Sequence, residues 1–306
     1  MDNVVGVWGN FQTIVLRDDN TLWGQGSNTY GQLAGGIEMG RHSFTREYVH
    51  LMDNVISASA GFNHTVALRA DGSVLAWGGN SRGQVGYDSP SQIGTGMWTR
   101  VSYPIRIMDD VVAIAAGGQK TFAIRSDGSL WGWGNNEFGQ MLCNVSGVSV
   151  RNPIHIMDNV AAVSAGGTSV AVIRVDGSLW TWGWRFGDAF PGDGTRTAPR
   201  VPVHVMDDVV AVDMLHRVCF AVRNDGSLWG WGFGGNAGIL GDGVANSTHL
   251  SPILIMENVV AASVGNNHAL AIDTNGRVWA WGANHVGQLG DGTTSIRHYP
   301  APVIFR

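Results

Sequence analysis

The residues that could supply a catalytic nucleophile form one short string, Gly79-Asn80-Ser81-Arg82-Gly83. A Gly-x-Ser-x-Gly string supports catalysis when a sharp strand-to-helix turn exposes the serine hydroxyl. Here the string is one copy of a loop that recurs along the chain, so Ser81 is a loop residue. We therefore predict that the protein is not an enzyme and that it has no catalytic residues.

Metal chemistry has equally little support. Three Gly-Asp-Gly turns, centred on Asp193, Asp242 and Asp291, each offer one carboxylate, whereas calcium takes 6–8 oxygen ligands. The ten histidines are scattered, and no His-x-x-x-His or Cys-x-x-Cys pair occurs, so zinc is not expected. The two cysteines, Cys143 and Cys219, are predicted to be free thiols. We predict no metal and no cofactor.

An internal repeat organises the whole chain. The phrase Asp127 to Gly134, Asp-Gly-Ser-Leu-Trp-Gly-Trp-Gly, is one of six close or looser copies. A second phrase, Met-Asp-Asn-Val or a close variant, starts at positions 1, 52, 108, 157, 206 and 256, so its copies are 49 to 56 residues apart. Self-similarity at such a period indicates a repeat architecture.

Each repeat is typical of about four short strands. In the third repeat the apolar segments 111–116 and 121–125 are followed by the Asp127-Gly128 turn and a strand at 130–133. Asp-Gly between two such segments is a strong hairpin signal, because glycine accepts the positive φ that the turn needs. A fourth strand follows at 153–157, with Pro153 at its first residue, where proline is tolerated.

These patterns predict an all-β protein: a β-propeller of six four-stranded antiparallel blades, closed where the chain ends meet. We predict one domain over 1–306, with repeats at approximately 1–51, 52–107, 108–156, 157–205, 206–255 and 256–306.

The charge pattern limits the partners. The net charge is −5, and Lys120 is the one lysine among 19 basic residues. No basic stripe exists for phosphate binding, so we expect no nucleic acid partner. No apolar run approaches the roughly 18 residues of a membrane span, and the N-terminus has no signal-peptide pattern. We expect no membrane association, a cytoplasmic location if the sequence is full-length, and a monomer.

A loop motif after the third strand carries a family resemblance. Trp-Gly-x-Asn-x-x-Gly-Gln stands at 77–84, 133–140 and 281–288, and a Gly-x-x-His-Thr turn stands at 61–65. Over essentially all 306 residues the sequence resembles the repeat of the regulator of chromosome condensation family. The resemblance implies a propeller, usually of seven blades, so six repeats are a departure. It also implies binding through a face or rim. Members of that family include an exchange factor for a small GTPase, a plant ultraviolet photoreceptor and bacterial enzyme inhibitors.

The tryptophans are predicted to be mostly structural. Ten of the 13 fall on the expected third strands, and residues i and i+2 of a strand share one face. Large rings at that position fill the space between blades. The photoreceptor's chromophore tryptophans lie in a Gly-Trp-Arg-His-Thr turn, and none of the six matching positions here is tryptophan, so that function is not implied.

The turns between the first and second strands vary from blade to blade. They are residues 10–12, 62–64, 118–120, 167–169, 216–218 and 266–268. A constant scaffold that carries varying loops is a common way to build a binding surface, although turns also vary wherever packing does not constrain them. We predict contacts with a protein partner in these turns and on two irregular loops. The predicted contact residues are Phe11, Phe62, His64, Lys120, His216, Arg217, His268, Trp98 and Trp184.

The leading hypothesis is a non-enzymatic, protein-binding propeller scaffold. One alternative is a regulator of an enzyme or a GTPase, acting as an exchange factor or an inhibitor. Another alternative is a glycan-binding module that uses Trp98 and Trp184, because aromatic rings outside the packing positions suit interaction sites.

Overall fold

A computed structural model describes residues 2–34, 43–87, 99–142, 149–184, 190–215 and 217–304. Trp98, Cys143 and His216 lie outside these ranges. The chain forms two compact units, Met1–Ala165 and Gly166–Arg306, and each is described by itself below. Over the described ranges, no helix is long and apolar enough to cross a membrane.

Six four-stranded sheets account for the described strands. The first three blades are β1 (Val4–Gly9), β2 (Gln12–Arg17), β3 (Leu22–Ser27) and β4 (Phe44–Met52); β5 (Val55–Ala60), β6 (His64–Arg69), β7 (Val74–Gly79) and β8 (Arg100–Met108); and β9 (Val111–Gly117), β10 (Lys120–Arg125), β11 (Leu130–Gly134) and β12 (Val150–Met157). The next three are β13 (Val160–Ala165), β14 (Ser169–Arg174), β15 (Leu179–Gly183) and β16 (Val203–Met206); β17 (Val209–Leu215), β18 (Val218–Arg223), β19 (Leu228–Phe233) and β20 (Thr248–Met256); and β21 (Val259–Val264), β22 (His268–Asp273), β23 (Val278–Gly282) and β24 (Arg297–Pro302).

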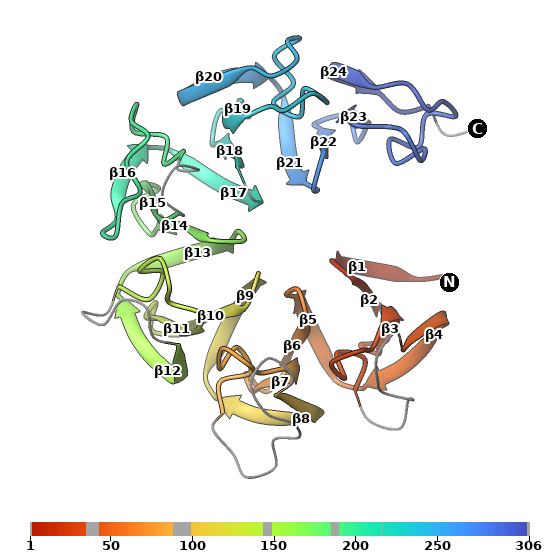
Figure 1. The fold of residues 1–306 in the computed structure, drawn as a ribbon, viewed down its shortest axis with the longest axis vertical. Helices are drawn as coiled ribbons and strands as arrows, with labels where there is room; N and C mark the ends of the chain where they lie inside the picture. Colours follow the sequence, from red (N-terminus) through yellow and green to blue (C-terminus); the bar gives the residue numbers. More distant parts are fainter. Residues whose placement is uncertain are drawn as a thin grey trace. The chain divides into compact units, whose positions relative to one another are not determined.

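The strands of each blade follow one another in chain order, and the registered pairs are antiparallel. The prediction of six four-stranded antiparallel blades is therefore confirmed. Within the first unit, the first strands β1, β5, β9 and β13 lie side by side, and the fourth strands lie on the outside (Figure 1). β1 and β24 belong to different sheets. Closure where the chain ends meet stays a prediction.

The Met-Asp-Asn-Val phrase is the crossover between blades. Its methionine ends the fourth strand, as in Met52 and Met157, and its third residue has a left-handed backbone, with φ 60° at both Asn54 and Asn159. Asparagine and aspartate tolerate this conformation better than other side chains, which explains why the phrase recurs. At each described crossover, the following valine N–H donates to a turn carbonyl of the preceding blade, for example Val160 to Gly128 at 3.0 Å.

The Asp-Gly-Ser phrase is the hairpin between the second and third strands. Asp127 accepts hydrogen bonds from the backbone N–H and the hydroxyl of Ser129, and Gly128 takes φ 80°. The same bonds join Asp225 to Ser227. In both, the serine hydrogen bond is the largest cause that lowers the pKa of the aspartate.

The paired tryptophans of the third strands divide their tasks. Trp133 is fully buried, and its Nε1 donates to the carbonyl of Gln84 in the preceding blade at 3.0 Å. Trp131 is half-buried, packs edge-on against His155 and donates to Ser129 within its own blade. Trp281 and Trp77 repeat the bond to the preceding blade. Trp133, Trp281 and Trp77 therefore join neighbouring blades, as predicted for a packing layer, whereas Trp131 bonds within its own blade.

Candidate partner-binding turns

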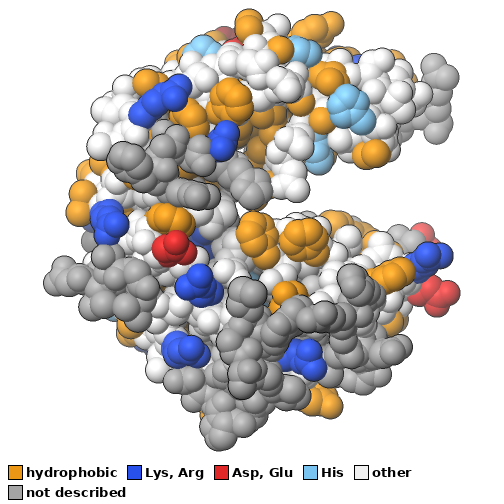
Figure 2. All heavy atoms as spheres, in the orientation of Figure 1, with side chains coloured by type: hydrophobic (Ala, Val, Ile, Leu, Met, Phe, Trp, Pro, Cys, Tyr) orange, Lys and Arg blue, Asp and Glu red, His pale blue; other side chains and the backbone are white. Residues whose placement is uncertain are grey.

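In the first unit, two predicted contact residues form an exposed aromatic pair. Phe11 follows β1 and is 64% exposed, and Phe62 follows β5 and is half-buried. Their ring centroids are 6.2 Å apart at 62°, an edge-to-face contact. Figure 2 shows hydrophobic side chains on the visible face where β1 and β5 end. The turns of two neighbouring blades therefore share one apolar surface.

Two other predicted contact residues of this unit, His64 and Lys120, are buried. They begin β6 and β10, and both are 0% exposed. His64 Nε2 lies 2.9 Å from Thr121 Oγ1 in the next blade, and Lys120 Nζ donates to Gly117 O at 3.5 Å. The structure therefore assigns both side chains to the packing between blades and removes them from the turn surface.

Burial shifts the pKa of both groups downward. Desolvation lowers the pKa of Lys120 to about 7. Desolvation, followed by the nearby charge of Lys120, lowers the pKa of His64 to about 3. In each case the low-dielectric surroundings disfavour the charged form. Both shifts show that burial of these side chains disfavours their protonated, charged forms.

The structure also revises the predictions for the loop tryptophans. Trp184 is 2% exposed, and its backbone N–H donates to Thr168 O at 3.0 Å. Its side chain is buried, so it offers no contact surface. Trp98 and His216, two further predicted contacts, lie outside the described residues.

In the second unit, the turns of the fifth and sixth blades border a pocket of about 260 Å³. Arg217 is exposed in the turn between β17 and β18, and its guanidinium lies 5.8 Å from the ring centre of Phe233. Asn266 and Asn267, from the turn between β21 and β22, also line the pocket. His268 follows them, half-buried, and desolvation lowers its pKa. Of the two contact residues predicted in this region, Arg217 lines the pocket. His268 directly follows the lining residue Asn267 in the sequence.

Sequence reasoning missed Phe233, Asn266 and Asn267 as pocket residues. Phe233 ends β19, far from the turns in sequence. One feature of the sequence could have indicated the pocket. The turn after the first strand begins with glycine in every blade except the fifth, where it begins with Leu215.

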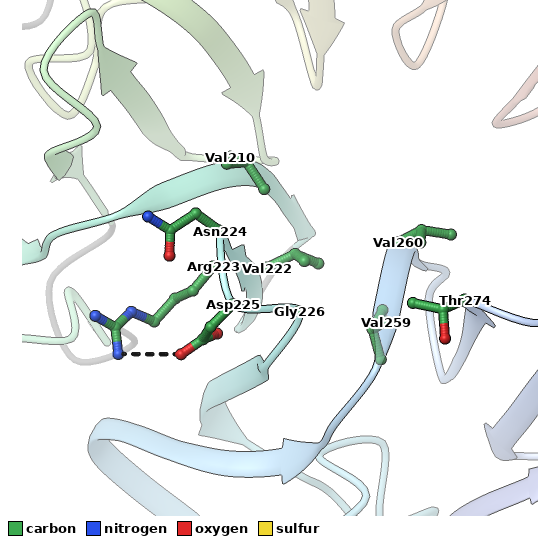
Figure 3. A pocket seen from close by; sticks show the side chains of 9 residues that line it. All are labelled: Val210, Val222, Arg223, Asn224, Asp225, Gly226, Val259, Val260 and Thr274. Carbon is green, nitrogen blue, oxygen red and sulfur yellow. Dashed lines mark ion pairs between the residues drawn. The ribbon is translucent and has the colours of Figure 1, made fainter.

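A second pocket of the second unit, about 410 Å³, lies at the hairpin end of the same two blades. Figure 3 shows Val210 and Val260 on its two sides, and Arg223 paired with Asp225 at 3.9 Å. Its polar groups are engaged in bonds that recur in other blades. Arg223 also pairs with Asp208 at 2.9 Å, and the Val259 N–H donates to Gly226 O. This end therefore holds blades together.

Among the residues that the structure describes, no group of three or more His, Cys, Asp or Glu side chains could hold a metal ion. Cys219 is buried, and burial raises the pKa of its thiol well above the usual range. Such a thiol is a packing residue rather than a nucleophile.

The fold and its repeated blades define a β-propeller, and comparisons identify its family. Two models of the regulator of chromosome condensation (RCC1) repeat match the chain, one at 55–84, 111–140 and 259–288, the other at 71–124, 225–272 and 275–306. Together they cover more than half of the sequence. The chain belongs to the RCC1 repeat family.

Known proteins of this type resemble the chain in part or throughout. The human X-linked retinitis pigmentosa GTPase regulator is 32% identical over 143 residues, which are 46% of this chain and 14% of that protein. Human WBSCR16 superposes with TM-score 0.85 at 22% identity, covering 100% of this chain and 83% of that one. Prp20p of Saccharomyces cerevisiae, described with its binding to Gsp1p and histones, gives TM-score 0.80 at 17% identity, covering 99% and 77%. The matched part of this chain covers less than a third of the length of the curated relatives that it matches.

Proposed function

We propose that this chain is a non-enzymatic, protein-binding propeller that contacts its partner through the turns between the first and second strands of its blades. The observation that carries the proposal is the exposed pair of Phe11 and Phe62. Aromatic side chains gathered at a surface are common centres of protein interfaces. Neighbouring blades supply one ring each, so the pair depends on the propeller scaffold.

The turn sequences add a second line of support. Exposed side chains differ from blade to blade at this end, while the hairpin ends repeat the same bonds. Variation on a constant frame provides a distinct surface without altering the fold. After the buried residues are set aside, the proposed contacts are Phe11, Phe62, Arg217 and His268.

Affinity capture with the immobilised chain, followed by mass spectrometry, tests this proposal. Phe11→Ala should reduce the recovery of specific partner proteins. Tyr103→Ala is the matched control, because Tyr103 on β8 of the same unit is also 64% exposed but lies away from the turns. Equal recovery with both variants would contradict the turn surface. Absence of any specific partner with the unmodified chain would contradict protein binding itself.

A second candidate function is the regulation of a small GTPase. The human relative carries that function in its name, and the yeast structure is described with its binding to Gsp1p. A fluorescent GDP release assay on a panel of purified small GTPases tests it, and unchanged release rates at micromolar protein would contradict it. We do not propose glycan binding, because Trp184 is buried and thus offers no ring to a sugar.

A further inference from the structure

The turn of the fifth blade departs from the other five in its first residue. Glycine stands there in the other blades, and a Cβ added at Gly61 or Gly265 would collide with the imidazole of the histidine three residues later. In the fifth blade that later residue is Val218, which has no ring to fold back. Leu215 is therefore accommodated, and both side chains line the 260 Å³ pocket.

The floor of this pocket is apolar and its rim is polar. Val218 and Ile239 are 4% and 6% exposed and belong to the hydrophobic core of the unit. Phe233 forms a wall beside Arg217, and Asn266 and Asn267 complete the rim. The volume is below the roughly 300–1,000 Å³ of typical small-molecule sites. Its size suits one inserted side chain.

The charge of the rim selects the kind of side chain. Among the described residues that line the pocket, Arg217 is the one that is charged, and its guanidinium lies over the ring of Phe233. Guanidinium groups bind carboxylates with strong, charge-assisted hydrogen bonds, and asparagine amides add neutral donors.

The turn sequences have the same bias. The six turns at 10–12, 62–64, 118–120, 167–169, 216–218 and 266–268 contain no aspartate or glutamate, although the chain has 24 acidic residues and a net charge of −5. An acidic partner segment therefore meets no like charge among the turn residues, where close like charges would oppose binding.

We propose that this pocket binds a glutamate or aspartate side chain on an exposed segment of the protein partner. The carboxylate lies against Arg217 and the two asparagine amides, and the methylene groups of the side chain lie on Val218 and Ile239. This inference rests on the proposed function, because it names the chemistry that one part of the turn surface recognises.

The test uses two small probes and NMR spectra of the isotope-labelled full chain. N-acetyl-Leu-Glu-amide should shift the signals of the Asn266 and Asn267 side-chain amides and of the Gly234 backbone in a saturable way. N-acetyl-Leu-Gln-amide, which has the same shape without the charge, should bind at least roughly tenfold more weakly. N-acetyl-phosphoserine-amide tests whether a phosphate is preferred over a carboxylate.

The variants separate the pocket from general charge effects. Arg217→Ala should weaken Glu-probe binding roughly ten- to thirtyfold, and Arg217→Lys should restore only part of it, because lysine lacks the planar fork of arginine. Arg196→Ala is the matched control, since Arg196 is also exposed and lies 5.4 Å from the ring centre of Phe190 in the same unit.

Each unfavourable result overturns a defined part of the inference. Failure of the Glu probe to shift the pocket signals, equal binding of the Gln probe, or equal losses in the two alanine variants would overturn the carboxylate pocket. Tighter binding of the phosphoserine probe would overturn the choice of carboxylate. The Phe11 experiment is in the other unit, so protein binding can stand when the pocket fails, and the reverse.

Discussion

The two ends of the fifth and sixth blades have opposite characters. At the hairpin end, Arg223 pairs with Asp208 and Asp225, and the Val259 N–H binds Gly226 O. The same kinds of bond recur in other blades, so that end serves the scaffold. At the turn end, Arg217 and the amides of Asn266 and Asn267 border a pocket whose residues differ from those at the matching positions of the other turns. Polar groups engaged in repeated bonds therefore mark structure, and polar groups that vary and border a pocket mark a candidate site.

The turns of the first unit are joined by a backbone hydrogen bond. The Phe62 N–H donates to Gly118 O at 2.9 Å, and Lys120, two residues after Gly118, is buried. In the second unit, Leu215 and Val218 stand where the other blades have a glycine and a polar residue, and both residues line the pocket.

The largest expected effect lies in the constant scaffold. Trp133→Ala should lower the free energy of unfolding by about 3–5 kcal/mol, because it removes a fully buried ring and the bond to Gln84 O. Trp131→Ala, two residues earlier and half-buried, should cost clearly less. Denaturant unfolding measures both. A cost below about 1 kcal/mol for Trp133→Ala would show that the second ring does not join blades.

The next effect depends on pH and concerns the turn that contains Lys120. The pKa of Lys120 is about 7 in the folded chain against 10.5 as the usual value. Between these values the unfolded chain binds more protons, so this group makes stability rise as pH increases from 7 toward 10.5.

Lys120→Met should remove that rise, and it should stabilise the chain at pH 7 by roughly 1–3 kcal/mol, because an uncharged side chain avoids desolvation of the ammonium group. Chemical denaturation of both proteins at pH 7, 8, 9 and 10 measures the difference. Parallel pH profiles would show that Lys120 is not buried as a charged group.

A smaller effect tests why the fifth turn differs. Gly265→Ala should destabilise by about 1 kcal/mol, because its Cβ would collide with the half-buried ring of His268. His268→Val imitates the Leu215 and Val218 arrangement of the fifth blade. The double variant should therefore recover most of the loss. Additive losses in a double-mutant cycle would refute this explanation of Leu215.

The smallest effect separates the two ends directly. Asp225→Ala should lower the melting temperature, because the Ser227 N–H and hydroxyl lose their acceptor. Asn267→Ala, on the pocket rim of the neighbouring blade, should leave the melting temperature nearly unchanged and weaken binding of the Glu probe. Thermal unfolding and the NMR titration measure the pair. The reverse pattern would exchange the roles assigned to the two ends.

Much of the scaffold was predictable because its signals are local. The Asp127-Gly128 hairpin, the tryptophans of the third strands and the Met-Asp-Asn crossover each depend on backbone geometry and alternation within a few residues. These signals were repeated six times, and repetition showed that they were structural. The candidate site was predicted less well, because exposure depends on neighbours from another blade. His64 and Lys120 stand one position later in their turns than Arg217 does in its own, and they are buried whereas Arg217 is exposed.

The number of repeats, the four strands in each and the place of the variable turns could be read along the chain, because they follow from short-range patterns. Which turn side chains face outward, and the meeting of Phe233, Arg217 and Asn267 at one pocket, depend on the packing of the folded chain. These three residues come from separate strands and turns of two blades. Their proximity arises from packing between sheets, which no spacing along the sequence records.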